Sequence, residues 1–329
     1  MFRRIRHAEN RPDDPLLPDD LEEKRLIASL KFEINACFEV VDKGEMVGWL
    51  RTAVTRPGAP GYEENRDFFW CFGSVVEPYR RRGIASSWLP IVVELMDRFG
   101  CRVVTFDSEE ESGHAFMKWL GAPVKGVGAE NRLRIAEVDW KMVRRWIEEG
   151  EKRNPQTTLE RYDDHIPDSM LDDYAPQLAA LLNTMPWDDL DHGPIVETAE
   201  TLREYYRRMD AEDQQHYTVL TREPDGVISG ITDIKFAPYR PKILEQLFTG
   251  VLPRARGRGI GKWIKAAMLE RMHEIYPDAE WVATGNADSN GPMLAINHKL
   301  GFKRYRSGAE YQLGRDELLA RIEELKVRA

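Results

Sequence analysis

The sequence predicts an α+β protein made of two similar domains in tandem. The prediction rests on three landmarks that recur in the same order in both halves: a glycine-tipped turn between strand-like runs, an arginine-rich glycine loop, and a helix that stops at Leu-Gly. The matching glycines are Gly44 and Gly226, Gly83 and Gly259, and Gly121 and Gly301, which lie 182, 176 and 180 residues apart. So regular a spacing indicates a duplicated domain. The repeat is too long to be one of the short units of a solenoid.

Each copy is expected to start with a β-hairpin. The first runs CFEVV, turns at DKGEM and continues as VGWLRTAV, and the second is YTVLTREPDGVISGITDIKF. A glycine at the tip of a polar turn favours a tight hairpin, because glycine accepts the positive φ angles that such turns need.

An apolar strand, a glycine loop and an amphipathic helix follow in each copy. These are SVVEPYRRRGIASSWL in the first half and FTGVLPRARGRGIGKWIKAAML in the second. In the second helix, Ile264, Ala267, Met268 and Met272 recur at the spacing of one buried face. A further strand, a polar loop and a second helix that ends in KWLGA or HKLGF complete each copy.

A charged amphipathic helix joins the copies. It lies within VDWKMVRRWIEEGEKRNPQTTL and should end near Asn154, because Pro155 cannot continue a helix and restrains the residue before it. The predicted domains are therefore residues 1–150 and 151–329. The closing segment RDELLARIEELKVRA has the charge pattern of a solvated helix and is expected to be a tail.

Composition argues against several classes of protein. The 329 residues are 42% hydrophobic, enough for a core in each domain, and no run of about 18 apolar residues is long enough to cross a membrane. The formal charge of −9 argues against a nucleic-acid partner. Three cysteines without CxxC spacing, and histidines without HxxxH pairing, indicate neither disulfides nor a bound metal. We expect a cytoplasmic protein that is a monomer or a homodimer.

The segment RARGRGIGK of the second half has the composition of an anion-binding loop. A strand ends there, glycines follow, and a helix begins with unpaired backbone N–H groups and about half a positive charge at its start. The GxxxxGK[ST] phosphate loop is absent, and no acidic residue stands where the dinucleotide fingerprint requires one. The expected guest is a pyrophosphate.

This loop resembles motif A of the GNAT acetyltransferase superfamily, whose signature is RxxGxG or RxxGxA after a strand. The matching residues are Arg256, Gly259 and Gly261 in the second half and Arg80, Gly83 and Ala85 in the first. The segment NGPMLAINHKLGF resembles the next motif of the family through Asn290, Gly301 and Phe302. The resemblance covers both halves and implies that each is a strongly bent mixed sheet flanked by helices.

The resemblance also implies acetyl-CoA as the cofactor, bound in a V-shaped opening between two splayed parallel strands. In the second half the implied cofactor-binding residues are Thr249, Gly250, Val251, Arg256, Gly257, Arg258, Gly259, Ile260, Gly261, Lys262 and Asn290. A second cofactor site in the first half would use Val76, Arg80, Arg81, Arg82, Gly83 and Ala85. This interpretation explains the basic cluster without a nucleic acid.

Acetyl transfer to an amine needs a base for the amine proton and donors for the oxyanion. Glu245 lies in the strand that leads to the loop, eight residues before Pro253, where an acid is costly unless it is paired or near solvent. The first half has Trp70 at the same distance from its own proline, a loop that is one residue shorter from proline to glycine, and Glu110 in place of Asn290. We therefore expect catalysis in the second domain, with Glu245 as the base. The first domain would be structural or would bind cofactor without turnover.

The tandem organisation resembles that of the mycothiol synthases, whose catalytic Glu occupies the position of Glu245. By that resemblance Lys235 would contact the substrate, and Asn297 stands where many relatives carry a general-acid Tyr. Asparagine cannot donate a proton as an acid, so water, Tyr305 or Tyr311 would protonate the leaving thiolate.

An acidic segment, LLNTMPWDDLDHG, precedes the second hairpin, where the family's substrate-recognition helices lie. Asp188, Asp189 and Asp191 would attract a cationic amine; the plainer interpretation is capping and turn chemistry, because Asp is favoured at N-caps. Plain alternatives also exist for Glu245, as a strand-pairing carboxylate, and for Lys235, as a solvated strand residue.

The predicted function is transfer of an acetyl group from acetyl-CoA to the amine of a small molecule by direct attack. Two alternatives stay open. One is a non-catalytic acyl-CoA-binding or regulatory module, and the other is acetylation of a protein amine.

Overall fold

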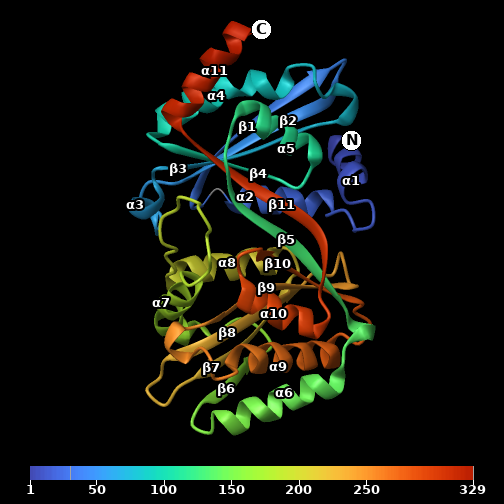
Figure 1. Cartoon of the computed structure of the whole chain (residues 1–329), viewed down its shortest axis with the longest axis vertical. Helices are drawn as coiled ribbons and strands as arrows, with labels where there is room; N and C mark the ends of the chain where they lie inside the picture. The colour runs from blue at the N-terminus through green and yellow to red at the C-terminus, as the bar shows by residue number, and fades with distance from the viewer. Residues whose placement is uncertain (30, 329) are drawn as a thin grey trace. The chain divides into compact units, whose positions relative to one another are not determined.

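The computed structural model describes residues 1–29 and 31–328, which form an α+β fold with eleven strands (Figure 1). The chain divides into two compact units. The first comprises Met1–Val127, Asp188–Pro194 and Gly308–Ala329, and the second comprises Gly128–Trp187 and Ile195–Ser307. Each unit has its own hydrophobic core.

The first unit contains a mixed sheet with the strand order β1-β2-β3-β4-β11. The strands β3 and β4 run parallel, and the other neighbours run antiparallel. Its elements are α1 (Phe2–Asn10), α2 (Asp19–Ser29), β1 (Glu33–Asp42), β2 (Glu45–Thr55), α3 (Tyr62–Asn65), β3 (Phe68–Val75), α4 (Ile84–Phe99), β4 (Val103–Ser108), α5 (Glu111–Leu120), β11 (Lys303–Gly314, which belongs to this unit from Gly308 onward) and α11 (Arg315–Arg328).

The core of the first unit lies between the sheet and α4. Leu50 and Phe69 of the sheet share this core with Met96 of α4 and with Leu318 and Ile322 of α11. Leu318 is 0% exposed, so the expectation that the closing helix is a solvated tail is wrong. The helix is charged on most sides, but leucine and isoleucine four residues apart give it one apolar stripe that packs beside α4.

The second unit contains a mixed sheet with the strand order β5-β10-β9-β8-β7-β6. Here β9 and β10 run parallel, and the other neighbours run antiparallel. Its elements are β5 (Val124–Arg134, which pairs with β10 from Gly128 onward), α6 (Trp140–Arg153), β6 (Thr158–Tyr162), α7 (Leu171–Leu182), α8 (Ala199–Ala211), β7 (Gln215–Arg222), β8 (Ile228–Phe236), β9 (Ile243–Val251), α9 (Ile260–Ile275), β10 (Trp281–Ala287) and α10 (Gly291–Leu300).

Helices cover both faces of the second sheet (Figure 1). Val219 packs with α6 and α9 on one face, and its neighbour Leu220 packs with α7 and α8 on the other, because successive side chains of a strand point to opposite faces. A Cβ atom on Gly150 of α6 would lie 2.2 Å from Cγ of Trp263. Glycine at this position therefore lets α6 and α9 approach closely.

Both predicted hairpins are confirmed. In the turn between β1 and β2, Lys43 and Gly44 have φ angles of 51° and 82°, and in the turn between β7 and β8 Gly226 has a φ of 87°. Positive φ at both Lys43 and Gly44 makes the first turn a two-residue hairpin turn, whereas the second is a longer connection, residues 223–227, in which Gly226 has the positive φ. The helix predicted to join the copies is also confirmed, because α6 ends at Arg153 with Asn154 as its C-cap.

Each half of the sequence contributes its last strand and helix to the other unit. Residues 128–153, with most of β5 and all of α6, belong to the second unit, and residues 308–328, with the end of β11 and all of α11, belong to the first. The helix α6 packs on α9, and α11 packs on α4. The predicted division at residue 150 follows the sequence repeat, whereas in the folded chain residues 128–150 are part of the second unit.

Candidate functional site

Both halves contain the same junction of a strand, a short 3₁₀ turn and a long helix. The turns are η1 (Glu77–Tyr79) after β3 and η4 (Pro253–Ala255) after β9. The helices α4 and α9 begin after Gly83 and Gly259, which have φ angles of 82° and 85°. This left-handed conformation favours glycine because it has no Cβ atom.

The two loops have equal length. Each 3₁₀ turn spans three residues and ends at an arginine, Arg80 or Arg256, three residues before the glycine. Nε of Arg80 donates to the Val75 carbonyl at 3.0 Å, and Nε of Arg256 donates to the Val251 carbonyl at 3.2 Å. The expectation of a shorter first loop is wrong. It counted the loop lengths from Pro78 and from Pro253, and these two prolines occupy different positions of the 3₁₀ turn.

Two parallel strands separate beside each junction. β9 pairs with β10 from Ile243 to Gln246 and then continues to Val251. β3 pairs with β4 from Phe68 to Cys71 and continues to Val75. The parallel ladders therefore stop partway along the strands in both units, at the ends that lead to the glycine loops.

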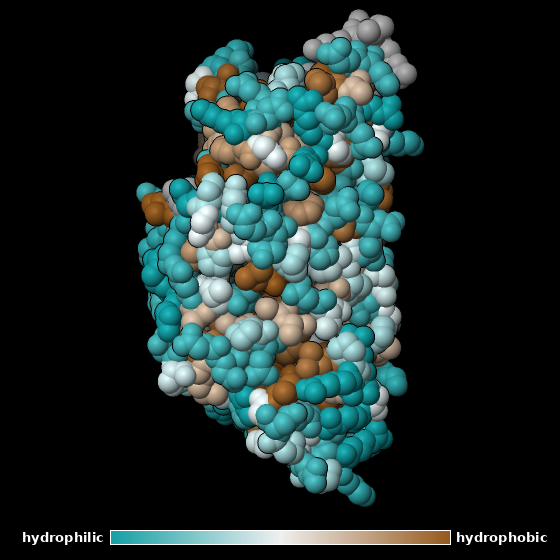
Figure 2. Space-filling view, turned by 90° about the vertical axis from the view of Figure 1, so that its left-hand side faces the viewer, coloured by the Kyte–Doolittle hydropathy of each residue, from teal (hydrophilic) through white to brown (hydrophobic). Residues whose placement is uncertain are grey.

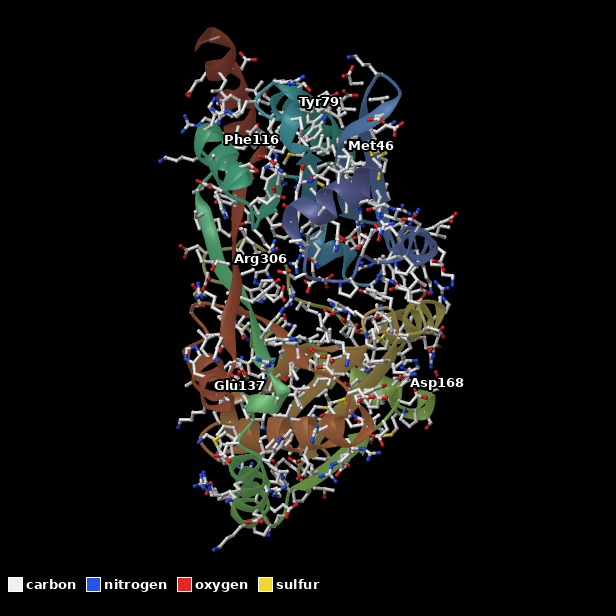
Figure 3. All side chains as sticks on the ribbon, turned by 90° about the vertical axis from the view of Figure 1, so that its right-hand side faces the viewer. Met46, Tyr79, Phe116, Glu137, Asp168 and Arg306 are labelled. Atoms are coloured by element: carbon white, nitrogen blue, oxygen red, sulfur yellow. The ribbon has the colours of Figure 1, made fainter. Side chains whose placement is uncertain are left out.

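The first unit has a cavity of about 410 Å³ at this opening. Its walls come from the ends of β3 and β4, the start of α4, and α5; Figure 3 labels two lining residues, Tyr79 and Phe116. Of the residues predicted for a first-half site, those that line it are Arg80, Arg81, Gly83 and Ala85. The volume lies within the range of about 300–1,000 Å³ that is usual for small-molecule sites.

The other two residues predicted for the first-half site lie elsewhere. Val76 is buried against Phe2 and Val47, and the guanidinium of Arg82 lies 4.7 Å from the centre of the Tyr79 ring.

Two arginines and two glutamates form an ion-pair network at the cavity. Arg6 of α1 contacts Glu9 and Glu110, and Arg80 lies 3.2 Å from Glu9 and 3.1 Å from Glu110. Burial would raise the pKa of Glu9, but hydrogen bonds from the backbone of Glu77 and from Arg6, with the charge of both arginines, lower it below its ordinary value. Sequence analysis missed Arg6 and Glu9, because nothing in the N-terminal segment links it to a loop 70 residues away.

Arg81 differs from its neighbour Arg80. It is exposed, lines the cavity and, among the residues that the structure describes, has no carboxylate within ion-pair distance. Its φ of 61° matches the φ of 80° at Gly257, which holds the same place in the second loop. Arg81 is therefore the cation of the first loop that is available to an anion.

The predicted loop of the second unit leaves its glycines accessible. A Cβ atom on Gly257 would meet nothing within 4 Å, and on Gly259 it would lie 3.6 Å from Nη1 of Arg153. Gly261 is more crowded, because a Cβ atom there would lie 3.3 Å from Cδ1 of Ile296. Ile260 is buried in the core, so only its backbone is available to a ligand.

The predicted cations of the second loop have partners of their own. Arg258 donates to Asn154, to Thr157 and to Glu223 at 2.9, 2.7 and 3.0 Å. Nζ of Lys262 lies 5.4 Å from the centre of the Trp146 ring. Arg258 therefore joins the loop to the end of α6, which the sequence did not indicate.

The predicted strand residues of this loop are held by their neighbours. The hydroxyl of Thr249 lies 2.7 Å from that of Thr232 on β8. A Cβ atom on Gly250 would lie 2.3 Å from Cζ of Phe248, so this ring packs across the glycine. The Val251 carbonyl is engaged by Arg256.

Glu245, the predicted base, lies on β9 opposite Lys235 on β8. Its Oε2 lies 3.4 Å from Nζ of Lys235 and also contacts Arg240. The structure therefore brings the two predicted catalytic and substrate residues together and adds Arg240, which the sequence analysis missed. A substrate ammonium at Glu245 would have to compete with these two cations.

Asn297 is fully buried on α10 in a cluster of amides. Its Nδ2 donates to Oδ1 of Asn286 on β10 at 2.8 Å, and Asn131 on β5 donates to the same oxygen at 3.4 Å. Asn290 is the N-cap of α10, with its Oδ1 accepting from the Met293 N–H at 3.4 Å.

The two tyrosines considered as proton donors lie in different units. Tyr305 belongs to the second unit, where the Arg132 guanidinium stacks 3.6 Å from the centre of its ring. Tyr311 belongs to the first unit, where its hydroxyl lies 2.7 Å from Nδ1 of His114.

The aspartates of the acidic segment before the second hairpin belong to the first unit, which takes residues 188–194, whereas residues 181–187 of the segment belong to the second unit. The Asp189 N–H donates to the carbonyl of Lys125 at 2.9 Å. Burial raises the pKa of Glu310, and the charges of Asp107 and Asp188 raise it further. Asp188 therefore lies near Glu310 of β11, and Asp189 lies beside Lys125 of β5.

Metal-binding clusters and membrane spans were not expected from the sequence. The described residues contain no group of three or more His, Cys, Asp or Glu side chains placed to hold a metal ion. Among the same residues, no helix has the length and apolar character of a membrane span. Figure 2 shows one face of the molecule, on which hydrophobic side chains gather in small patches among hydrophilic ones.

Comparisons with known proteins agree with this geometry. A scan against protein-family models found no match, and a search of curated proteins found none either. Among solved structures, a tandem GNAT protein from the clavulanic acid biosynthesis pathway matches with a TM-score of 0.67 and 20% identity over 94% of this chain and 91% of its own.

Two further structures have the same fold. A GCN5-related N-acetyltransferase from Sphaerobacter thermophilus matches with a TM-score of 0.58 and 14% identity over 85% of this chain and 80% of its own. A GCN5-related glucosamine N-acetyltransferase region of a fungal multi-domain β-N-acetylglucosaminidase matches with a TM-score of 0.62 and 13% identity, over 93% of this chain and 36% of its own. The two junctions, the two interrupted parallel ladders and these similarities together show that the chain has the tandem GNAT fold.

Proposed function

We propose that this protein is an N-acetyltransferase that moves the acetyl group of acetyl-CoA to an amine of a small molecule. The observation that carries the proposal is the duplicated junction, in which a strand separates from its parallel neighbour and a helix begins after a glycine with a φ of 82° or 85°. Unpaired N–H groups and the positive end of the helix dipole at such a start favour a phosphate group.

The two units have different roles in this proposal. The first unit binds the coenzyme, supported by the cavity of about 410 Å³ at its loop and by the exposed Arg81. The second unit carries catalysis, supported by Glu245 on β9. In the first unit, the position equivalent to Glu245, counted back from the glycine Gly83 instead of Gly259, holds Phe69. Phe69 is fully buried and cannot act as a base.

Direct attack by the amine is the proposed mechanism. Acetyl-CoA supplies the acetyl group as an activated thioester. Glu245 would accept the proton of the substrate ammonium, directly or through one water, and backbone N–H groups near Thr249–Val251 would polarise the carbonyl. A nitrogen–carbon bond forms as the carbon–sulfur bond breaks. The second proton that the nitrogen loses would pass through water to the leaving thiolate, because Asn297 cannot supply a proton.

A second candidate function is an acyl-CoA-binding module without turnover. Two observations favour it. Glu245 is already paired with Lys235 and Arg240, and Asn297 is buried in an amide cluster where many relatives carry a general-acid Tyr.

Matched variants of the two helix starts would test the proposal. Ala85→Asp and Gly261→Asp each place a carboxylate in the first turn of a helix, where it repels a bound phosphate but favours the helix dipole. We expect Ala85→Asp to weaken acetyl-CoA binding in the first unit, measured by calorimetry, and Gly261→Asp to abolish amine-dependent release of free thiol. Ala85→Ser and Gly261→Ala control for side-chain size.

The outcomes separate the two candidate functions. Amine-dependent thiol release from the unmodified protein that is lost in Gly261→Asp supports the acetyltransferase. Tight acetyl-CoA binding without thiol release, across a panel of amines, supports the binding module. If neither aspartate changes binding or turnover, the helix starts do not hold the coenzyme.

A further inference from the structure

The cavity of the first unit has a polar end and an apolar end. The polar end lies at the glycine loop and the start of α5, where its lining residues include Arg81, Glu110 and Ser112. Six lining residues belong instead to the hydrophobic core of the unit, and none of them is more than 7% exposed: Leu50, Cys71, Leu89, Val92, Phe106 and Met117. The cavity therefore continues from the loop into the core.

The apolar end begins where the two parallel strands separate. Cys71 of β3 and Phe106 of β4 are the last pair of the parallel ladder, and both line the cavity. Gly73 lies on the same face of β3 as Cys71, because alternate residues of a strand share a face. A Cβ atom on Gly73 would lie 2.9 Å from Cζ3 of Trp88 on α4. The apolar end therefore lies between the separating strands and α4.

No charged side chain lines the apolar end among the residues that the structure describes. Its polar atom is the thiol of Cys71, and burial raises the pKa of this thiol above its ordinary value, with a further rise from the charge of Asp107. The thiol therefore stays protonated and behaves as a small apolar group. A ligand that enters this end gains by burying apolar surface and has few partners for polar atoms.

The chemistry of an acyl-CoA suits this division of the cavity. Its phosphates match the helix start after Gly83 and the exposed Arg81. The amides of its pantetheine arm need hydrogen-bond partners, and β3 can supply them beyond Cys71, where its backbone no longer pairs with β4. The part of the molecule without polar groups is the hydrocarbon of the acyl chain, and it is the part that fits the apolar end.

The second unit differs from the first at the matching positions. Counted from the loop glycine and then across the strand register, the positions of Leu50, Gly73 and Leu89 are held there by Thr232, Thr249 and Lys265. Two apolar side chains and a glycine are thus replaced by two hydroxyls and an amine.

These polar residues of the second unit are already bonded to one another. The hydroxyl of Thr232 lies 2.7 Å from that of Thr249 and accepts from Nε2 of Gln246 at 2.7 Å. Nζ of Lys265 donates to Oε1 of Gln246 at 2.8 Å. A hydrocarbon chain placed here would separate these partners and leave buried polar atoms without hydrogen bonds, which is unfavourable. Only the first unit therefore offers an apolar environment at this place.

We propose that the first unit binds an acyl-CoA whose acyl group is longer than acetyl, with the hydrocarbon chain in the apolar end of the cavity. The inference rests on the proposed function for the identity of the coenzyme. The copy that lacks the proposed base thus binds a different acyl donor from the copy that carries Glu245.

The affinity for acyl-CoAs of increasing chain length tests the inference on the full chain. Acetyl-CoA, butanoyl-CoA and hexanoyl-CoA are compared by calorimetry without an amine, so that no turnover occurs. Each methylene that is buried should tighten binding by about fourfold. We expect hexanoyl-CoA to bind at least about tenfold more tightly than acetyl-CoA, with Ala85→Asp losing this gain and Gly261→Asp keeping it.

A pair of variants on α4 tests where the chain lies. Val92→Phe fills the apolar end, and it should lower the affinity for hexanoyl-CoA more than that for acetyl-CoA. Val93→Phe is the matched control, because Val93 is buried in the same core but does not line the cavity; it should keep the full gain. The ¹³C-methyl NMR signal of Met117, assigned with Met117→Leu, should shift further with hexanoyl-CoA than with acetyl-CoA.

Three results would overturn the inference: equal affinities along the series, a gain that persists in Ala85→Asp, or a Met117 signal that responds equally to the two coenzymes. The series and the Met117 signal use the unmodified protein, so they stay decisive if Val92→Phe does not fold. Equal affinities together with amine-dependent thiol release from acetyl-CoA would refute the inference alone. A gain with chain length but no thiol release would refute the proposed function alone.

Discussion

Lys265 gives a sharp prediction about stability and pH. This lysine of α9 is 3% exposed, and its Nζ donates to Oε1 of Gln246 at 2.8 Å and lies 5.3 Å from the centre of the Phe302 ring. A neutral amide and an aromatic ring replace only part of the water that an ammonium loses. Burial therefore lowers the pKa of Lys265 from 10.5 to about 7.

The effect on stability follows from proton binding. Between pH 7 and 10.5 the unfolded chain holds the proton of Lys265 and the folded chain does not, so the free energy of unfolding rises with pH by about 1.4 kcal/mol per unit. Below pH 7 both states hold the proton, and the full penalty of burying the charge, about 5 kcal/mol over this interval, is present. The penalty fades as the pH rises through this range.

Replacing Lys265 with methionine removes the titrating group and keeps most of the volume. We expect Lys265→Met to exceed the unmodified protein in free energy of unfolding by the largest amount near pH 6.5. This advantage should shrink by roughly 2 kcal/mol between pH 7 and pH 9. Loss of the hydrogen bond to Gln246 subtracts about 1 kcal/mol at every pH and does not alter the slope.

The assay is urea unfolding at pH 6.5, 7, 8 and 9, followed by tryptophan fluorescence, to which the buried Trp263 on the same helix contributes. Lys299→Met, at an exposed position of α10, is the matched control and should show a difference that does not vary with pH. A constant difference for Lys265→Met from pH 6.5 to 9 would refute the reasoning, since it would mean that the folded protein keeps Lys265 charged.

Two further predictions concern Glu245, the proposed base, and α11, the last helix of the second half, which packs in the first unit. Glu245→Gln should lower turnover by about 10²–10⁴-fold while acetyl-CoA affinity in calorimetry stays the same, because a general base is lost and the loop is not touched. The control is Glu280→Gln, which changes an exposed partner of Lys242. Unchanged turnover of Glu245→Gln would remove Glu245 from the mechanism. Leu318→Ala should lower the free energy of unfolding of the first unit by about 2–5 kcal/mol in urea, because it empties a buried site beside α4. An effect no larger than that of the exposed Glu323→Ala would mean that α11 is not part of this core.

Local features were predictable because their causes lie within a few residues. The hairpins depend on Gly44 and Gly226, which have the positive φ expected of them, and the helix starts depend on Gly83 and Gly259, whose φ is also positive. The end of α6 at Asn154 follows from the proline after it. In each case the backbone preference of one or two residues decides the structure.

The candidate site was only partly predictable. The proximity of Lys235 to Glu245 followed from the register of one hairpin and its neighbouring strand. Arg258, in contrast, was expected at a phosphate and instead joins α6 to the loop, because Glu223 and Thr157 reach it from distant parts of the chain. No local pattern marks such partners.

The amino-acid sequence by itself determined the duplication, the order of strands and helices in each copy, and the two glycine loops that begin α4 and α9. These depend on periodicity and backbone preference, which are properties of short segments. The tertiary structure alone decided where the last strand and helix of each copy belong: α6 packs on α9 and α11 on α4, because their apolar stripes find complementary surfaces there. It also decided the location of the cavity, the pairing of Arg6 with Glu110, and the meeting of His216 with Asp233, because burial and charge pairing arise between residues that are distant in the chain.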